Sequence, residues 1–523
     1  MNIYISHKWV KTLCLGICLV GLILFFAYSI KIQYINGAEI SNITVRSEDG
    51  AIDIKWNSTN PAIYDKMRVV ISDGENIVYE KEVLPISQHL SYEDGEHGKL
   101  YTVSVTPPQN KDGTWGETYE KQALFLNYGE LPNLPIIVIN TANGKDPSYE
   151  VAEVPEGFSG ATITNNEYVF GEMSMHESGM RGKSISTGVK IRVRGNTSSI
   201  FEAKKSYKIH LDMPYPLLED DDISCEEWIL LNNGISLNTY VGDYVGEICG
   251  MEWQPHMRFV NVILNGDWKG CYCLTTAIGI DSAESNVSSS GYIFEYDSYW
   301  WNSDGLYFRT ENQSGRFGYT FKYPDVTSPD DEVVLRLKKY MQKFENCILN
   351  GDEQYREYID ETSYARWILA QDILGNKDGD GSNMYYYKYD YYQSNPTSTK
   401  VKMGPLWDFD HVFLRDDNWS YSRAAGPYFP QLFEQNTFYN EYMNNWVSVA
   451  PYLNNQIDEM LNQLGMESGS AIDESWALDA ARWMRGIDSF RTQKERVSRW
   501  FKNRVVWMNN ALGIDAMDVS TAL

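Results

Sequence analysis

Apolar and polar residues alternate along several stretches of the chain, and this pattern predicts β-strands. Between Ala38 and Asn127 the alternation recurs in AIDIKW (51–56), MRVVIS (67–72) and LYTVSVTP (100–107), with the turn-forming pairs DG, NP and PP nearby. Period-two runs bounded by such pairs are typical of antiparallel strands that bury one face. We therefore expect a small all-β sandwich over residues 38–127.

Two aromatic residues give this sandwich a more specific interpretation. Trp56 shares one predicted strand face with Ile52 and Ile54, and a Y-x-V-x-V run begins at Tyr101, 45 residues after Trp56. In immunoglobulin-like sandwiches a strand tryptophan packs in the core and a later tyrosine forms the tyrosine corner. Residues 38–127 therefore resemble a fibronectin type III domain. Such domains commonly act as spacers or binding surfaces, and this segment offers no catalytic set of residues.

An uncharged apolar run from Thr12 to Ile30 dominates the N-terminus. As a helix it would extend about 29 Å, the thickness of a bilayer core. Lysines precede the run, so the positive-inside rule predicts a cytoplasmic N-terminus and an exported remainder. The small residues Ala27 and Ser29 leave a cleavable signal peptide open. We expect residues 1–36 to be a signal anchor or a signal peptide. The protein would then be a single-pass cell-membrane protein with its bulk outside, or a secreted protein if the segment is cleaved.

Size, charge and cysteine content narrow the functional classes. With 523 residues, 43% of them hydrophobic, the chain has material for about three domains. Its formal net charge of −26 repels polyanions, so we expect no nucleic-acid partner and an attraction for divalent cations. The cysteines form no CxxC pair, which argues against a zinc ribbon or a thiol redox site.

A cationic segment follows the proline-stiffened linker LPNLP (131–135), which opens a larger domain over 136–523. Residues 188–212 read GVKIRVRGNTSSIFEAKKSYKIHLD, in which two basic alternating runs flank a loop of small residues. Backbone N–H groups and basic side chains in such a loop can converge on a phosphate. A solvated amphipathic hairpin is the alternative interpretation.

The rest of this domain predicts a mixture of strands and helices. A helix is expected over 240–250, a β-hairpin turning at Asn265-Gly266, and strands in GYIFEYD (291–297) and FKYPD (321–325). Helices are then expected from near Asp331, from Ser363 and from Thr437 to the end, including a continuous segment over 480–513 that packs on the domain. The expected fold class is α+β.

Two acidic loops carry the strongest chemical signal. NKDGDGSN (376–383) places Asp378 two residues before Asp380, and LWDFD (406–410) places Asp408 two residues before Asp410. If the loops meet, their oxygens can bind a divalent cation that a nucleoside triphosphate shares. Asn383 follows Asp378 by five residues, the offset between the base and the metal-binding asparagine of protein kinases.

Two other functions fit parts of these loops. Asn376, Asp378, Asp380 and Gly381 match an EF-hand calcium loop, but the closing position holds Tyr387 instead of glutamate. A D-x-D pair also occurs in metal-dependent glycosyltransferases, although no doubly wound nucleotide-sugar domain is evident.

Eight motifs in order resemble the spore-coat protein H (CotH) kinase family. They are V-R-G-N-T-S, K-K-S-Y-K-I, W-I-L-L, N-G-x-x-x-G, G-Y-I-F-E-Y-D, K-Y-P-D, N-x-D-G-D-G-S-N-x-Y-Y-Y-K and G-P-L-W-D-F-D, over a core of residues 190–413. The resemblance implies a secreted or surface-bound enzyme with an atypical, two-lobed protein-kinase-like domain. It also implies that ATP and a divalent metal, Mg²⁺ or Mn²⁺ with Ca²⁺ possible, serve to phosphorylate proteins on the cell surface or coat.

The resemblance also assigns roles to residues. Asp378 would orient or deprotonate the acceptor hydroxyl, and Asn383, Asp408 and Asp410 would hold the metal. Glu247 is the candidate for the helix glutamate that, in protein kinases, pairs with the phosphate-binding lysine. A catalytically inactive scaffold that binds metal or nucleotide during envelope or spore-coat assembly is the alternative function. The residues expected over the nucleotide and its phosphates are Arg194, Gly195, Asn196, Lys204, Lys205 and Lys208.

Overall fold

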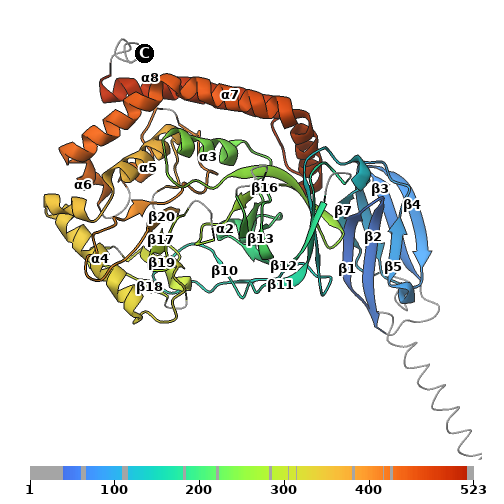
Figure 1. The fold of residues 1–523 in the computed structure, drawn as a ribbon. Helices are drawn as coiled ribbons and strands as arrows, with labels where there is room; N and C mark the ends of the chain where they lie inside the picture. Colours follow the sequence, from blue (N-terminus) through green and yellow to red (C-terminus); the bar gives the residue numbers. More distant parts are fainter. Residues whose placement is uncertain are drawn as a thin grey trace, which may run out of the picture. The chain divides into compact units, whose positions relative to one another are not determined.

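The protein has an α+β fold that divides into two compact units at Leu131/Pro132 (Figure 1). Each unit has its own hydrophobic core. The computed structural model describes residues 39–59, 66–108, 116–180, 184–218, 223–281, 285–303, 306–313, 315–379, 383–415, 417–424 and 428–514.

The first unit is a β-sandwich of two antiparallel sheets. A three-stranded sheet has the order β1-β2-β5, and a four-stranded sheet has the order β4-β3-β6-β7. The alternation of apolar and polar residues explains why the two sheets pack face to face, since Ile52 and Ile54 on one sheet face the same core as Val103 and Val105 on the other. The strands are β1 (Glu39–Glu48), β2 (Ala51–Thr59), β3 (Met67–Asp73), β4 (Asn76–Val83), β5 (His89–Tyr92), β6 (Leu100–Thr106) and β7 (Tyr119–Leu124).

The two aromatic residues singled out in the sequence are both buried in this core. The Nε1–H of Trp56 donates a hydrogen bond to the carbonyl of Pro85 (2.8 Å). The hydroxyl of Tyr101 accepts one from the backbone N–H of Glu96, five residues upstream (3.0 Å). A backbone bond a few residues upstream is what a tyrosine corner requires. The fibronectin type III identity itself stays a prediction.

The second unit begins with a closed seven-stranded barrel. Its strand order is β11-β12-β13-β14-β16-β15-β8, and β8 closes the circle by pairing antiparallel with β11 and parallel with β15. The predicted hairpin at Asn265-Gly266 joins β15 to β16, with both turn residues at positive φ as a type I′ turn requires. The strands are β8 (Ile136–Thr141), β11 (Val169–His176), β12 (Ser184–Arg194), β13 (Ser206–Tyr215), β14 (Cys225–Leu231), β15 (Met257–Leu264) and β16 (Asp267–Thr276), beside a separate pair β9 (Glu150–Val151) and β10 (Ile163–Thr164).

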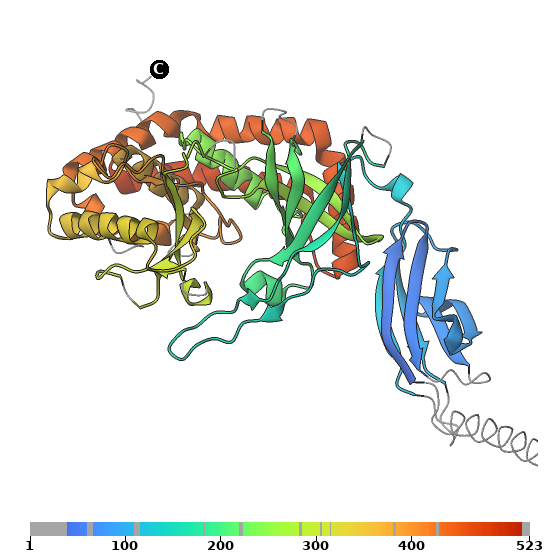
Figure 2. The same ribbon diagram turned by 60° about the horizontal axis from the view of Figure 1, so that its bottom comes forward.

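A second sheet, surrounded by helices, completes this unit. Figures 1 and 2 show the barrel on one side of the unit, the five-stranded sheet with α4, α5 and α6 on the other, and the long α7 running along both. The sheet order is β18-β19-β17-β20-β21. The elements are β17 (Tyr292–Asp297), β18 (Tyr307–Phe308), β19 (Gly318–Tyr323), β20 (Met384–Lys388), β21 (Lys402–Met403), α2 (Thr197–Phe201), α3 (Asn238–Ile248), α4 (Glu332–Leu349), α5 (Glu361–Leu374), α6 (Phe429–Phe433), α7 (Asn436–Trp483) and α8 (Phe490–Leu512).

The C-terminal part differs from its prediction in one respect. The segment over 480–513, expected as a continuous helix, is divided between α7 and α8. Helix α7 ends at Trp483, and the next residue, Met484, adopts a left-handed conformation (φ 50°). The side chain of Ser489 caps α8 by accepting a hydrogen bond from Thr492 N–H (3.2 Å). Trp476 and Phe501 are buried, so the predicted packing of these helices on the domain is confirmed.

The expected membrane anchor, residues 1–36, lies outside the described residues, and the prediction of a single-pass membrane protein gains no support from the structure. In the part of the chain that is described, no helix combines the length and the apolar character needed to cross a bilayer.

Candidate active site

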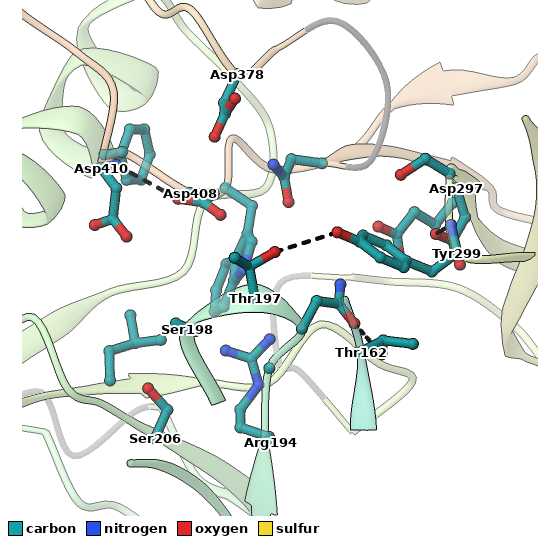
Figure 3. A pocket seen from close by; sticks show the side chains of 18 of the residues that line it. Thr162, Arg194, Thr197, Ser198, Ser206, Asp297, Tyr299, Asp378, Asp408 and Asp410 are labelled. Atoms are coloured by element: carbon teal, nitrogen blue, oxygen red, sulfur yellow. Dashed lines mark hydrogen bonds between the residues drawn. The ribbon is translucent and has the colours of Figure 1, made fainter. Parts of the chain in front are cut away.

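A cavity of about 970 Å³ lies in the second unit and is lined by both the barrel and the second sheet (Figure 3). The barrel contributes the end of β12, the following loop with α2, and parts of β13 and β14. The second sheet contributes β17, β19 and β20, and the two acidic loops form a further wall. The cavity therefore brings together segments that lie more than 200 residues apart in the sequence.

The two acidic loops meet, as their sequences predicted they could. The backbone N–H of Lys377 donates to the carbonyl of His411 (3.1 Å), and the Asn376 side-chain N–H donates to the carbonyl of Asp408 (3.3 Å). Asn376 also accepts a hydrogen bond from Asp378 N–H (2.9 Å), which forms an Asx turn at the start of its loop. These bonds fix one loop on the other at their bases.

Local structure explains why the first loop starts where it does. The side chain of Asp360 caps the N-terminus of α5 by accepting a hydrogen bond from Ser363 N–H (3.0 Å). Gly375, at φ 57°, ends the helix in the left-handed conformation that glycine adopts readily. The chain then turns into the cavity with Asn376 and Asp378.

Three carboxylates lie on one side of the cavity. Figure 3 shows Asp378, Asp408 and Asp410 there, with Arg194 reaching toward them from β12. Asp410 accepts a hydrogen bond from the side-chain amide of Asn233 (2.9 Å), and Asp378 lies 3.6 Å from His411. Burial, followed by the negative charges of Asp410 and Asp378, raises the pKa of Asp408 to about 7.

Asp408 has a strained backbone. Its φ of 64° lies in the left-handed region, which costs free energy for a residue with a Cβ, although less for aspartate than for most others. The next residue, Phe409, is buried against α3, where a Cβ on Gly242 would approach its ring to 2.2 Å. The close contact with Gly242 fixes Phe409, and this position holds Asp408 at the cavity wall.

The donors at this wall fit a hard divalent cation. Asn383 lines the same cavity, so the two acidic loops contribute the Asp378, Asp408 and Asp410 carboxylates and the Asn383 amide to its lining, and oxygen ligands of this kind suit Mg²⁺, Mn²⁺ or Ca²⁺. A bound cation would offset both causes that raise the pKa of Asp408, its burial and the repulsion from Asp410 and Asp378. Asp380 and Gly381, which the EF-hand interpretation needs, lie outside the described residues, and Tyr387 lies on β20, where its hydroxyl donates to Glu252 (3.3 Å).

The opposite wall is formed by the loop after β12. Arg194, Gly195 and Asn196, the residues expected over the nucleotide, all line the cavity. The Arg194 guanidinium lies over the Trp407 ring, 5.5 Å from its centroid, and within the described part of the chain no carboxylate forms an ion pair with it. Gly195 has φ 112°, and the carbonyl of Arg194 accepts a hydrogen bond from the Ser199 hydroxyl (2.6 Å). Because no described carboxylate forms an ion pair with it, the Arg194 guanidinium is available to an anion.

The three candidate lysines lie elsewhere. Among the described residues, none of them lines the cavity. Lys204 is fully buried in an ion pair with Asp479 (2.6 Å), Lys205 donates to the carbonyls of Ser199 and Glu202 near the base of α2, and Lys208 pairs with Glu227 (2.7 Å) on the neighbouring strand. Each lysine already has an oxygen partner, so this geometry does not support their assignment to phosphate groups.

The sequence interpretation missed a second charged group in the cavity. Lys322 on β19 pairs with Glu295 on β17 (2.9 Å), and both line the cavity together with Asp297. Burial raises the pKa of Glu295 to about 7, although Lys322 lies beside it. Glu295 and Lys322 occur in the motifs G-Y-I-F-E-Y-D and K-Y-P-D, but only the pairing of β17 with β19 reveals that they meet.

The helix glutamate lies in a different cluster. Glu247 on α3 contacts His256 (3.2 Å), and with Asp243 these side chains place ligand atoms within 4.8 Å of one another. Asp243 also accepts a hydrogen bond from Gln254 (3.1 Å), whose own oxygen accepts from Leu406 N–H (2.9 Å). Gln254 therefore links Asp243 to the start of the Asp408 loop. Among the described residues, Glu247 forms its ion pair with His256 and with none of the three candidate lysines.

Comparison with known families agrees with this arrangement. The family model described as CotH kinase protein matches residues 191–508, more than half of the chain. The match extends past the predicted motif core, 190–413, through α7 and into α8. No curated protein matches the chain. The match indicates a kinase-type enzyme, and the chain belongs to the CotH kinase protein family.

Proposed function

We propose that the protein is an ATP- and divalent-metal-dependent protein kinase that transfers the γ-phosphoryl group to hydroxyl side chains of proteins on the cell surface or coat. One observation carries the proposal: two acidic loops, hydrogen-bonded to each other, face an Arg194 guanidinium that has no carboxylate ion pair in the described chain. Phosphoryl transfer depends chiefly on positioning and charge neutralisation. A cavity with cation ligands on one wall and a free cationic group on the other offers both.

The residues take distinct roles in this reaction. Asp378 accepts the proton of the acceptor hydroxyl, whose oxygen forms the new bond to phosphorus as the bond to the leaving diphosphate oxygen breaks. Arg194 neutralises charge on the phosphate oxygens. Lys322, held by Glu295, adds a second cation at the same cavity. The barrel and the second sheet take the places of the two lobes of a kinase-like domain.

The acidic loops supply the metal site. Asp408, Asp410 and Asn383 would hold the ion, which when bound neutralises negative charge on the nucleotide phosphates. Asn233 keeps Asp410 in position through its hydrogen bond (2.9 Å). Phe409 packs against α3 and so orients the backbone that carries both aspartates.

Labelled ATP with Mn²⁺ tests the function directly. We expect residues 38–523 to transfer phosphate to themselves or to added protein, and Asp378→Asn and Asp408→Asn to lower the rate by about 10³-fold or more. A matched control is Asp417→Asn, an exposed aspartate paired with Arg415 outside the cavity, which should leave the rate unchanged. Transfer that persists in both cavity variants would contradict the proposal.

An inactive scaffold is the second candidate, and one observation favours it. The three lysines expected at the phosphates all have other partners and lie outside the cavity lining, so the phosphate contacts that the sequence suggested for them are missing. A scaffold would show nucleotide-dependent thermal stabilisation in Mn²⁺ without any transfer of label. Loss of that stabilisation in Asp408→Asn would still place the metal at the acidic loops.

Export belongs to the same proposal. The apolar run at residues 12–30 supports a membrane anchor or a signal peptide, and the β-sandwich, proposed to be a fibronectin type III module, would present the kinase to its protein substrates. Alkaline carbonate extraction of membranes would distinguish an anchored from a released protein.

A further inference from the structure

The C-terminal end of α5, which leads into the Asp378 loop, has every one of its last carbonyls bonded. Such groups lack partners within the helix and need others. The carbonyl of Gln371 accepts from Asn376 N–H (3.1 Å), and that of Asp372 accepts from Gly375 N–H (3.1 Å). The carbonyl of Leu374 accepts from the N–H of Phe413 (3.2 Å), which follows the Asp408 loop.

The remaining bonds come from α8, more than 120 residues away in the sequence. Arg504 donates from Nε (2.8 Å) and from Nη2 to the carbonyl of Asp372, and Trp500 donates from Nε1 to the carbonyl of Ile373 (3.1 Å). Arg504 is fully buried and also donates from Nη1 to the carbonyl of Asn418 (2.6 Å). A cation at this end of α5 is favourable to the helix dipole as well.

The same helix contacts both acidic loops through apolar groups. The Trp500 ring lies against Gly375, where a Cβ would approach it to 2.8 Å. The Phe413 ring lies 5.5 Å from Trp500 and 5.7 Å from Phe501, measured between ring centroids. Helix α8 therefore touches the base of the Asp378 loop and the base of the Asp408 loop at one place.

We propose that Arg504 and Trp500 are positioning residues for phosphoryl transfer: they fix the end of α5 so that the loop that carries Asp378 and Asn383 stays at a fixed distance from Asp408, with Asn383 and Asp408 close enough to share one divalent ion. This inference rests on the proposed function. Helix α8 is thereby part of the active unit, which agrees with a family match that reaches residue 508. Neither residue lines the cavity, so their effect is transmitted through the backbone.

Two conservative variants test the inference. Arg504→Lys keeps the positive charge but loses the planar fork that makes three bonds, and Trp500→Phe keeps an aromatic ring but loses one N–H donor. For both we expect kcat to fall by about 10–100-fold with little change in the KM for ATP, because a small displacement of reacting groups is costly. We also expect the dissociation constant for Mn²⁺, titrated by electron paramagnetic resonance in the presence of ATP, to rise several-fold.

The matched control is Trp446→Phe. Trp446 on α7 is buried and donates to the Asn509 side chain of α8 (2.9 Å), so it fastens the same helix without touching α5's last carbonyls. Even if Trp446→Phe lowers the melting temperature as much as the two test variants do, it should leave kcat and Mn²⁺ affinity near the wild-type values. Equal losses of both quantities in all three variants would overturn the inference.

The Mn²⁺ titration also separates this inference from the proposed function. If the wild type binds Mn²⁺·ATP without transferring phosphate, and Arg504→Lys and Trp500→Phe weaken that binding, the positioning role stands and the kinase activity does not. If the wild type binds no Mn²⁺·ATP, there is no ion site to position and the inference fails.

Discussion

Asp408 shows how single residues are arranged for function at the expense of stability. Its backbone is in the left-handed region and its carboxylate is buried beside two others, so both strain and repulsion act on it. Strain of this kind persists only where the surroundings enforce it, and it concentrates at functional sites. Here the Asn376 bond to the Asp408 carbonyl and the packing of Phe409 enforce it.

Asp408→Asn should therefore separate stability from activity. Asparagine tolerates the left-handed conformation and carries no charge, so the free energy of unfolding at pH 8 should be equal to or higher than that of the wild type. Urea unfolding measures this change, beside the phosphate-transfer rate, which should fall. A clearly destabilised variant would show that Asp408 has a structural role and not a strained functional one.

Gly242→Ala tests the packing behind Asp408. In an exposed helix interior alanine would stabilise α3 by about 0.5–1 kcal/mol relative to glycine. At position 242, however, its Cβ would meet the Phe409 ring at 2.2 Å, so we expect a loss of stability and a lower phosphate-transfer rate. Gly246→Ala, on the same helix, is a useful comparison because its Cβ would meet the Gln254 side chain at 2.5 Å and would leave the Phe409 ring untouched. A more stable and fully active Gly242→Ala would contradict this account.

Much of the site was accessible to sequence reasoning at the residue scale. Asp378, Asn383, Asp408, Asp410 and the Arg194 loop were predicted because their spacing reflects local chemistry, and all of them line one cavity. The role of Lys204 was not accessible, since its partner Asp479 lies 275 residues away and no local pattern indicates the pair. Lys322 and Glu295 were missed for the same reason.

At the scale of elements, α4 carries an unusual buried acid. Glu345 is fully buried and forms no ion pair with any basic residue that the structure describes, but it accepts hydrogen bonds from Thr310, from Tyr319 (3.1 Å) and from Asn312 (3.4 Å). Burial raises the pKa of Glu345 from its ordinary value of 4.5 to about 7. The neutral acid is therefore the form that the fold favours.

This gives a pH dependence with a definite sign. Because the folded-state pKa is raised, the native protein binds more protons than the unfolded chain between about pH 4.5 and 7, so stability falls as the pH rises through that window. The loss attributable to Glu345 has an upper limit of about 3 kcal/mol. In Glu345→Gln this contribution should be absent. The free energy of unfolding of the variant, relative to that of the wild type, should therefore increase between pH 5 and pH 8. Parallel stability curves for the two proteins would refute the assignment.

Element prediction succeeded where the signal was local. The hairpin at Asn265-Gly266 and helix α3 follow from turn chemistry and periodicity, and both are confirmed. The closure of the barrel by β8 was not predictable, because it needs a parallel pairing between strands more than 100 residues apart. The break between α7 and α8 was missed because Arg485–Asp488 contains only one residue, Gly486, that disfavours a helix strongly.

At the scale of the whole second unit, one buried charge cluster joins the barrel to α7. Asp479 on α7 accepts hydrogen bonds from Lys204 (2.6 Å), from Arg485 (2.6 Å) and from the backbone N–H of Cys271 on β16 (2.8 Å). Asp479 and Lys204 are both fully buried. Gly270 leaves the space for this cluster, since a Cβ there would lie 2.0 Å from the Asp479 carboxylate.

Asp479→Asn should therefore be strongly destabilising. It leaves the buried Lys204 without a counter-charge, and breaking such a pair typically costs about 3–5 kcal/mol. Replacing both partners, as Lys204→Met with Asp479→Leu, should recover a large part of that loss, and urea unfolding of the three proteins measures it. If Lys204 instead serves the nucleotide, Lys204→Met alone would abolish ATP binding in a protein that stays folded.

In the proposed kinase, the two acidic loops bind one divalent ion in the cavity beside Arg194. Crystals grown with Mn²⁺ and a non-hydrolysable ATP analogue, measured at the manganese absorption edge, test it directly by anomalous scattering. We predict a manganese peak within coordination distance of both the Asn383 side chain and the Asp408 carboxylate, with the analogue's phosphates extending toward Arg194. A peak only at Asp243, Glu247 and His256, or none in the cavity, would contradict it.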